Sequence, residues 1–467
     1  MRNTLILCAL ALLFSDAMCN KNGFNGQSIV IDSVSPRHGN SGTIVTITGS
    51  GFSPDTSQDE VSFAFLSGRM VSASPTQLVV VVPAVADSAG LDSVVILISV
   101  NQLSPTGAGY FYYNIAQPNT VSTFAGSGAS GHANGTGTAA TFSNPENGAV
   151  DKYGNLFVAD YGNNEIREIT LQGVVTTFAG STAGTAGFKN ANGTSALFNQ
   201  PSGLAFDNQG NLYVSDQGNN VIRKIDPQGN VTTLAGSGSA FYGDAVGTGA
   251  SFNAPIGIGY DSVSNALYVA DSHNNDVRKI TLNGDTVSTI AGSLYPGNYN
   301  GGGNPLNASF NSPRGITIER SEGLYIYVSD YGNNELRMIV NIGDSTAVFT
   351  LSGTGSPGLT NGTGTATFFN PNGTALGYSP KGVAEFFIAD ASNHAIRYGI
   401  EDPASVIAGN LDVSTLAGNG IPGLVNGSYA QARFSYPDGV VFNPIDGNLY
   451  VIEFGNNDVR KIVVPNP

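Results

Sequence analysis

The chain has 467 residues, of which 41% are hydrophobic, 11% are charged and 61 are glycine, which is typical of a turn-rich β protein and not of a helical or disordered one. A formal net charge of −15 opposes binding to nucleic acid phosphates, so no nucleic-acid partner is expected. The two cysteines, Cys8 and Cys19, lie near the N-terminus, which excludes a disulfide framework.

The N-terminal sequence "MRNTLILCALALLFSDAMC" predicts a secretory signal peptide over residues 1–18. Its apolar stretch, residues 5–14, is too short to cross a bilayer. Cys19 resembles the acylated cysteine of bacterial lipoproteins, although Asp16 and Met18 depart from that motif. We expect an exported protein with one of two fates. Acylation of Cys19 would anchor it in the outer membrane or at the cell surface, and this anchor would be its contact with the membrane. Ordinary cleavage would leave it periplasmic or secreted.

Residues 28–115 contain closely spaced strand signals. "GTIVTITGSGF" (42–52) alternates strictly, and "SPTQLVVVVPAV" (74–85) is a second run, a pattern that predicts a β-sandwich. The order "SPRHGNSGTIVTITGSGF", "VSFAF", "SASPTQLVVVVP" resembles the IPT/TIG family of immunoglobulin-like domains. The resemblance implies a spacer or an interaction unit. "AQPNT" (116–120) is the expected linker.

Residues 121–467 repeat a unit of about 55–63 residues. Each unit holds four phrases of the types "VSTFAG", "FNQPSGLAFD", "NLYVSD" and "VIRKI", and each phrase is a short β-branched or aromatic run bounded by Gly, Asn or Pro. Four strands per unit predict a β-propeller. The repeats resemble NHL-repeat propellers, for example in "GNLYVSDQGNNVIRKI" and "FNSPRGITIE".

The phase of the repeat predicts how the propeller closes. The region begins with an outer-strand phrase at 121–126 and ends with a third-strand phrase at 458–464. Pairing the two completes a sixth blade and removes the open edges. The predicted fold is therefore all-β, an N-terminal Ig-like β-sandwich followed by a six-bladed β-propeller.

Each unit contains an acid followed seven residues later by an arginine. The pairs are Asp160/Arg167, Asp216/Arg223, Asp271/Arg278, Asp330/Arg337, Asp390/Arg397 and Glu453/Arg460. The acid ends the second strand, the arginine lies on the third, and an Asn pair makes the turn between them, so the charges should lie close across one hairpin. A ring of carboxylates that binds a cation or activates water is one interpretation. Six copies of one structural pair is the favoured one, because every acid has its own arginine and identical sites supply no division of roles.

If the repeated phrase is the frame, binding should occur where the copies differ. The connections after the second and fourth strands share one face, which also carries the long Gly-rich loops. The candidate ligand-binding residues, at or next to the position after the repeated acid, are Tyr161, Gln217, His273, Tyr331 and Phe454. Ser272 and Ala391 complete that position, and the loops add Tyr242, Tyr295 and Tyr299. The alternative is that loop aromatics pack under their own loops.

Five "NGT" or "NGS" triplets match the N-glycosylation acceptor pattern, at Asn134, Asn192, Asn361, Asn372 and Asn426. Asn-Gly is also a common turn dipeptide, and the bacterial type of signal favours the turn interpretation.

The sequence favours a non-enzymatic protein. Propeller lyases and lactonases place His and carboxylate ligands on innermost strands, whereas here those strands read "GLAFD", "GIGYD", "GITIE", "TALGY" and "GVVFN". The four histidines, His38, His132, His273 and His394, are scattered, and no nucleophile elbow or nucleotide-binding loop occurs. We expect a surface protein that binds a glycan or a peptide or protein ligand, with no metal or cofactor. The alternatives are a hydrolase or lyase with an atypical site on the same face, and a structural adhesin.

Overall fold

The computed structural model describes residues 30–35, 38–39, 44–56, 61–63, 66–67, 69–81, 93–100, 106–107, 110–114, 120–320, 323–342, 345–378, 384–400 and 411–464. The predicted signal peptide, Cys19 and all of the predicted linker but Thr120 lie outside these residues. The chain divides into two compact units, Met1–Gln117 and Pro118–Pro467. Over the described ranges, no helix has the length and apolar character that crossing a bilayer requires.

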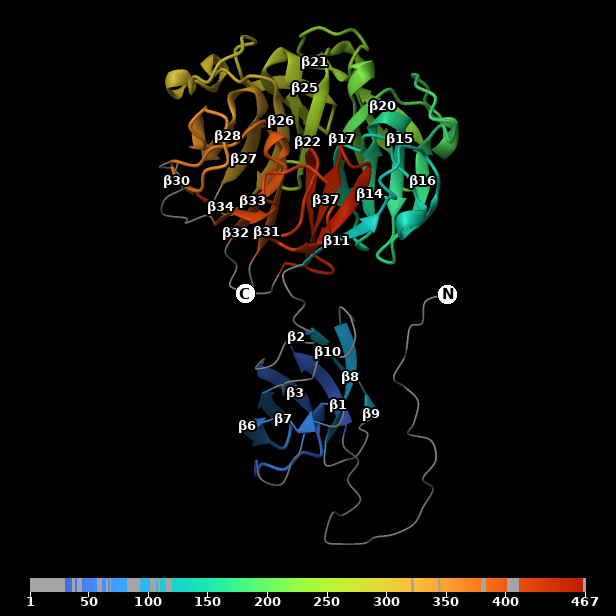
Figure 1. Cartoon of the computed structure of the whole chain (residues 1–467), viewed down its shortest axis with the longest axis vertical. Helices are drawn as coiled ribbons and strands as arrows, with labels where there is room; N and C mark the ends of the chain where they lie inside the picture. The colour runs from blue at the N-terminus through green and yellow to red at the C-terminus, as the bar shows by residue number, and fades with distance from the viewer. Residues whose placement is uncertain are drawn as a thin grey trace. The chain divides into compact units, whose positions relative to one another are not determined.

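The first unit is a β-sandwich of two five-stranded sheets (Figure 1). The first sheet has the order β6 (Arg69–Ser74), β7 (Gln77–Val81), β3 (Ile44–Ser50), β1 (Val30–Ser35), β9 (Thr106–Gly107). The second has the order β2 (His38–Gly39), β10 (Tyr110–Asn114), β8 (Ser93–Val100), β4 (Val61–Phe63), β5 (Leu66–Ser67). Val45 and Ile47 of β3 are fully buried and alternate with more exposed neighbours, as one buried sheet face requires. The predicted Ig-like sandwich is confirmed.

The second unit is a six-bladed propeller, with one antiparallel sheet per blade (Figure 1). Blade 1 comprises β13 (Gly148–Val150), β14 (Leu156–Asp160), β15 (Glu165–Ile169) and β16 (Val174–Gly180). Blade 2 comprises β17 (Pro201–Phe206), β18 (Leu212–Asp216), β19 (Val221–Ile225) and β20 (Val231–Ala235). Blade 3 comprises β22 (Pro255–Asp261), β23 (Ala266–Asp271), β24 (Asp276–Thr281) and β25 (Thr286–Ala291).

Blade 4 comprises β26 (Pro313–Glu319), β27 (Leu324–Asp330), β28 (Glu335–Ile342) and β29 (Ser345–Ser352). Blade 5 comprises β31 (Pro371–Tyr378), β32 (Ala384–Asp390), β33 (Ala395–Ile400) and β34 (Asp412–Ala417). Blade 6 comprises β36 (Pro437–Asn443), β37 (Asn448–Glu453), β38 (Asp458–Ile462) and β11 (Thr120–Ala125).

Short elements from the long loops add to this frame. Two-residue strands extend blades 1, 3, 5 and 6, namely β12 (Gly135–Thr136), β21 (Ala245–Val246), β30 (Gly362–Thr363) and β35 (Gly427–Ser428). The loops also hold the 3-10 turns η1 (Gly137–Ala139), η3 (Gly193–Ser195), η5 (Gly247–Gly249), η7 (Gly301–Gly303) and η8 (Pro305–Asn307).

The core of the propeller lies between neighbouring blades. Each buried apolar cluster draws side chains from two consecutive blades, and the cluster of blades 6 and 1 closes the series. The same phenylalanine of each repeat is fully buried at its blade interface: Phe142, Phe198, Phe252, Phe310, Phe368 and Phe434. Each blade is therefore stabilised by its neighbours on both sides.

The two ends of the propeller region meet in blade 6, as the phase of the repeat predicts. β11 pairs antiparallel with β38, with Val121 opposite Ile462 and Thr123 opposite Arg460. Val121 is buried in the cluster of blades 5 and 6, and Ala125 in that of blades 6 and 1. The fourth strand of the last blade thus comes from the start of the region.

We predict that removal of β11 destabilises the propeller strongly, because blade 6 then exposes an edge and two inter-blade clusters lose buried side chains. A chain of residues 127–467 should melt well below its matched control, a chain of residues 118–467. Equal melting temperatures in scanning calorimetry would contradict the closure by β11.

Candidate functional site

The repeated acid–arginine pairs are fully buried ion pairs. In all six blades the arginine Nη1 lies 2.7–2.9 Å from a carboxylate oxygen of its acid, and both side chains are 0% exposed. Burial raises the pKa of the acid, to about 6 for Asp160 and about 7 for Glu453, and the arginine opposes the rise. The pair therefore carries a desolvation cost that its surroundings must offset.

The strand register shows that each pair is diagonal. Asp216 stands opposite Val221, and Arg223 stands opposite Val214, two residues further along the hairpin. The same offset occurs in every blade, where the residue facing the arginine is apolar: Val158 faces Arg167, Val269 faces Arg278, Val328 faces Arg337, Ile388 faces Arg397 and Val451 faces Arg460. A long arginine side chain can reach a diagonal neighbour. The charges are thus close across one hairpin, as predicted, without being direct cross-strand partners.

The expectation that every acid has its own arginine needs a correction in four blades, where a second acid lies near the same arginine. In blade 3 the second acid is the loop residue Asp244, whose Oδ1 lies 2.6 Å from Arg278 Nη2. In the other three blades it lies on the third strand. In blade 1 the buried acid Glu165 has its Oε2 3.7 Å from Arg167 Nε. The equivalent distances are 3.9 Å from Arg337 to Glu335 and 3.9 Å from Arg460 to Asp458. These three contacts with Nε are too long for hydrogen bonds. The buried Nε accordingly has no hydrogen-bond partner in any of the six arginines, namely Arg167, Arg223, Arg278, Arg337, Arg397 and Arg460.

The other hydrogen bonds of the pair come from the remaining repeated phrases. The acid accepts from the first Asn of the turn and from the backbone N–H that follows the buried phenylalanine, as Asp216 does from Asn219 at 2.9 Å and from Asn199 at 2.8 Å. The guanidinium lies over that phenylalanine, 5.0 Å from the ring centre for Arg223 and Phe198. The same contacts recur in the other five blades.

The arginine also holds the long loop of its own blade interface. Its Nη2 donates to one loop side chain in each blade: Asn134, Asn190, Asp244, Asn300, Asn361 and Asn426. Three of these asparagines belong to the "NGT" or "NGS" triplets, so their side chains are already engaged by the buried arginine. Asn372 of a fourth triplet lies on strand β31 and not in a turn.

The second residue of each Asn pair joins neighbouring blades. It adopts a left-handed backbone, with φ of 51–56°, and its side chain accepts from a backbone N–H of the next blade at 2.8–3.1 Å. Asparagine tolerates this backbone well. In blade 5 the residue is His394, whose Nδ1 accepts from the N–H of Tyr436. His394 is thus a structural replacement for asparagine in the ring of inter-blade bonds.

The residues predicted to bind ligand lie in different environments. Tyr161, Gln217 and Tyr331 begin the 3-10 turns η2 (Tyr161–Asn163), η4 (Gln217–Asn219) and η9 (Tyr331–Asn333), and all three are partly buried. Tyr161 contacts Phe454 across the closure of the ring, at 6.3 Å between ring centres.

His273 does not share the environment of the turn tyrosines. It is the second residue of η6 (Ser272–Asn274), where other blades have Gly or Ser, and it is exposed. Ser272 and Ala391, which begins η10 (Ala391–Asn393), are buried. Among the loop tyrosines, Tyr242 packs on Arg278, whereas Tyr295 and Tyr299 are exposed.

A set of residues that differs from blade to blade begins the innermost strands. Between the repeated Pro and Gly stand Glu146, Ser202, Ile256, Arg314, Asn372 and Asp438, in blade order. The Pro pairs with the repeated acid of its own blade, as Pro201 does with Asp216, so these residues lie beside the turns that carry Tyr161 and Tyr331. We call this set, with its two neighbouring tyrosines, the channel mouth.

The glycine beside each mouth residue explains why they form a closed ring. A methyl group on Gly257 would lie 1.8 Å from the carbonyl oxygen of Arg314 in the next blade, so no side chain fits there. Equivalent approaches occur from Gly203 to Ile256 and from Gly439 to Glu146. Neighbouring innermost strands therefore touch backbone to backbone, and Glu146 lies three blades from Arg314.

The mouth carries charge that its own residues do not neutralise by contact. Arg314 lies over the ring of Tyr331 at 3.8 Å. Asp438 accepts from Asn372 Nδ2 at 2.7 Å. Glu146 is partly exposed, but the protein around it still desolvates its carboxyl group, and this desolvation, then repulsion from Asp438, raises its pKa to about 8. Burial raises the pKa of Asp438 to about 6. Burial is also the main reason why the pKa values of Tyr161 and Tyr331 are raised.

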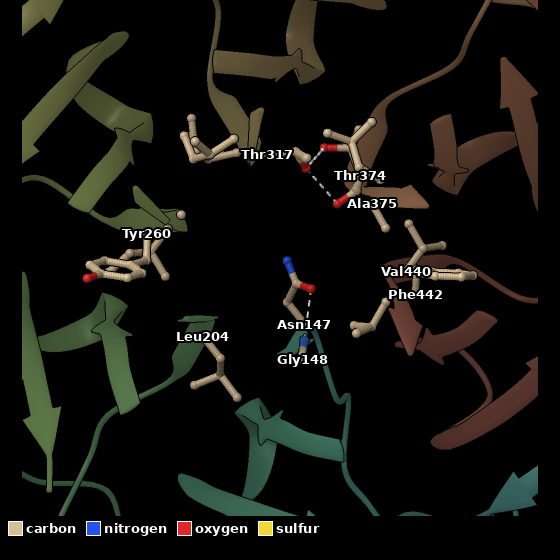
Figure 2. A pocket seen from close by; sticks show the side chains of 15 residues that line it. Asn147, Gly148, Leu204, Tyr260, Thr317, Thr374, Ala375, Val440 and Phe442 are labelled. Carbon is tan, nitrogen blue, oxygen red and sulfur yellow. Dashed lines mark hydrogen bonds between the residues drawn. The ribbon is translucent and has the colours of Figure 1, made fainter. Parts of the chain in front are cut away.

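Below the mouth, the channel contains a cavity of about 240 Å³ (Figure 2). Its wall continues the same strands two residues on. Most of its side chains are apolar, such as Leu204, Ile316 and Val440, although the surface that faces the cavity is mainly polar. Blade 1 has one residue more than the others between its Pro and Gly, and Figure 2 shows the extra residue, Asn147, projecting into the middle of the channel.

The sequence interpretation missed these residues because it began the five innermost strands that it quoted at the glycine or just after it. From the glycine onward the side chains of these strands are mostly apolar, which describes the residues that line the cavity. The polar and charged residues of the mouth lie just before the glycine. The signal was present in the aligned phrases: the residue between Pro and Gly changes in every copy while its neighbours repeat.

Comparison with known proteins agrees with this architecture. Residues 30–113 match the IPT/TIG domain, and residues 198–225 match the NHL repeat. The chain contains an IPT/TIG domain and an NHL repeat. It is 29% identical over 329 residues to the protein SUPPRESSOR OF QUENCHING 1, chloroplastic, of Arabidopsis thaliana. The match covers 67% of this chain and 30% of the plant protein, so the NHL-repeat chain spans less than a third of that relative's length.

Two solved structures share both parts of the NHL-repeat chain. One is a structural genomics protein of unknown function from Bacteroides thetaiotaomicron, with a TM-score of 0.58, 20% identity, and 93% of this chain and 98% of that chain covered. The other, described as an auxiliary nutrient binding protein from the same organism, has a TM-score of 0.57, 18% identity, and 94% and 98% covered. At these identities the comparison shows the fold.

We predict that Arg223 acts as part of the frame. Arg223→Ala leaves Asp216 buried without its cation and should lower the free energy of unfolding by about 3 kcal/mol. The double variant with Asp216→Asn should recover part of that loss in denaturant unfolding. Undiminished stability of Arg223→Ala would contradict the structural role.

We predict that His394 makes stability sensitive to mild acid. Burial lowers its pKa, and Nδ1 must stay unprotonated to accept from Tyr436. The stabilisation is therefore present above the unfolded-state pKa of about 6.5 and is lost as pH falls below it. His394→Asn, which restores the residue of the other blades, should melt with a smaller drop between pH 7 and pH 5 than the wild type. His273→Asn, at an exposed turn position, is the matched control and should leave the drop unchanged.

Proposed function

We propose that the protein is an exported, non-enzymatic binding protein that takes a glycan or a peptide or protein ligand at the channel mouth. The observation that carries this proposal is the contrast between frame and mouth. Arginine, acid, phenylalanine and asparagine repeat in all six blades and bind one another, whereas the mouth presents six different residues on a rigid ring. Such a ring over a partly apolar cavity has the composition of a ligand site.

Three further points support the proposal. The long loops share the face of the mouth, and exposed aromatic side chains such as Tyr295 and Tyr299 stand on them. A solved structure of the same fold is described as an auxiliary nutrient binding protein. The N-terminal sequence is of the exported type. In this proposal the IPT/TIG domain is a spacer, and Cys19 carries the lipid anchor.

An enzymatic alternative is favoured by one observation, the carboxyl pair Glu146 and Asp438. A glutamic acid with a pKa of about 8 is protonated at neutral pH and can serve as a general acid. A hydrolase or lyase of this kind would need no histidine. The two functions differ in their products: a binding protein returns its ligand unchanged, and an enzyme does not.

A glycan and peptide array probed with residues 20–467, followed by chromatography of the bound compound, tests both functions. We expect saturable binding and recovery of intact ligand. Tyr331→Ala removes the ring beneath Arg314 and should weaken binding about tenfold at little cost in stability. Tyr153→Ala is the matched control, because Tyr153 is exposed in the turn between the first and second strands of blade 1, on the face opposite the mouth, and this variant should bind as the wild type does. Conversion of the ligand by the wild type and its loss in Glu146→Gln would establish the enzymatic alternative.

A further inference from the structure

The acids of the mouth differ from the repeated acids of the frame in one respect. Each repeated acid has an arginine within 2.9 Å. Glu146 and Asp438 have no such partner within the described residues, although Asp438 is 4% exposed. Their strands are neighbours, because Gly439 lies against the carbonyl of Glu146. Two acids are thus held side by side at the mouth, and no basic side chain of the described residues forms an ion pair with them.

The arginine of the mouth does not fill this role. Arg314 belongs to blade 4, across the channel from Glu146 in blade 1, and is held over Tyr331. Its field lowers the pKa of both acids, but no described contact brings its guanidinium within ion-pair distance of either. The mouth therefore has an unpaired anionic side and an unpaired cationic side.

We propose that the channel mouth binds a primary ammonium group of its ligand between Glu146 and Asp438, with an acceptor group of the same ligand facing Arg314. This inference rests on the proposed binding function and names the chemistry of its ligand. An ammonium group has three donors, which suit two carboxylates and one further acceptor such as the Tyr161 hydroxyl. Amino sugars and peptide amines both offer this group.

Binding of an ammonium group at this site is linked to proton release. Glu146 is mostly protonated at neutral pH, and a cation beside it favours its ionised form. The other titratable or charged groups that act on it are Asp438, Arg314, Tyr161 and Tyr331, and the raised pKa values of the tyrosines keep both neutral. Affinity should therefore rise with pH up to about 8, by about tenfold from pH 6 to pH 7.

Isothermal titration calorimetry of the mature protein tests this with glucosamine, glycylglycine and lysine amide as probes. The matched neutral compounds are glucose and N-acetyl-glycylglycine. At least one amine should bind, more tightly at pH 8 than at pH 6, while its neutral counterpart binds at least about tenfold more weakly. Titration in two buffers of different ionisation enthalpy should show proton release. The amine that binds identifies the source as sugar or peptide.

Variants locate the effect. Glu146→Gln should lose the pH dependence and at least about tenfold in affinity, with an unchanged melting temperature. Glu168→Gln, a partly exposed carboxylate on β15 of the same blade, is the matched control and should change neither. The inference is overturned if no amine binds at tens of millimolar, if neutral compounds bind equally well, or if Glu146→Gln keeps the pH dependence. Array binding of a neutral glycan would then uphold the binding function alone.

Discussion

The propeller depends on an arginine whose side chain is fully buried in every blade. In each blade it pairs with the acid at the end of the second strand. It also lies over the buried phenylalanine that precedes the first strand of the blade, and it donates a hydrogen bond to a side chain of the long loop. A buried pair of this kind is costly unless its surroundings supply further hydrogen bonds. Strand, turn, core and loop thus all contact one charged centre. A change in any of them alters the contacts of this centre with the others. This explains why the whole phrase repeats and not the arginine alone.

The sequence predicted the large-scale architecture well because that architecture is periodic. Six copies of one phrase fix the number of blades, and the phase of the copies places β11 beside β38. The seven-residue spacing likewise brings Asp216 and Arg223 together, diagonally across one hairpin. The acid–arginine pair is a local relation between residues on adjacent strands, which a repeat unit specifies without reference to the rest of the molecule. The second acid near Arg167 or Arg337 was missed because it belongs to some copies and not to others.

The site could not be predicted in the same way, because it is formed by residues that the repeat does not share. Glu146 and Asp438 are almost 300 positions apart in the chain and become neighbours when the ring closes. Their pKa values follow from burial and from the charges around them, which no single copy reveals. Asn147 projects into the channel because blade 1 has one extra residue between its Pro and Gly. The sequence shows this insertion, but only the structure shows that the inserted residue faces the channel. The exposed position of His273 likewise depends on the direction of a turn.

The place of β11 in blade 6 has a consequence for how the protein comes to be made. A ribosome delivers residues 120–125 before any blade exists, and their partner strand follows more than three hundred residues later. During that interval the first strand of the region has nothing to pair with, and the loop that it must close is among the longest possible in the chain. Blades 1 to 5 can form in order of synthesis, but the ring becomes a single cooperative body at the last step.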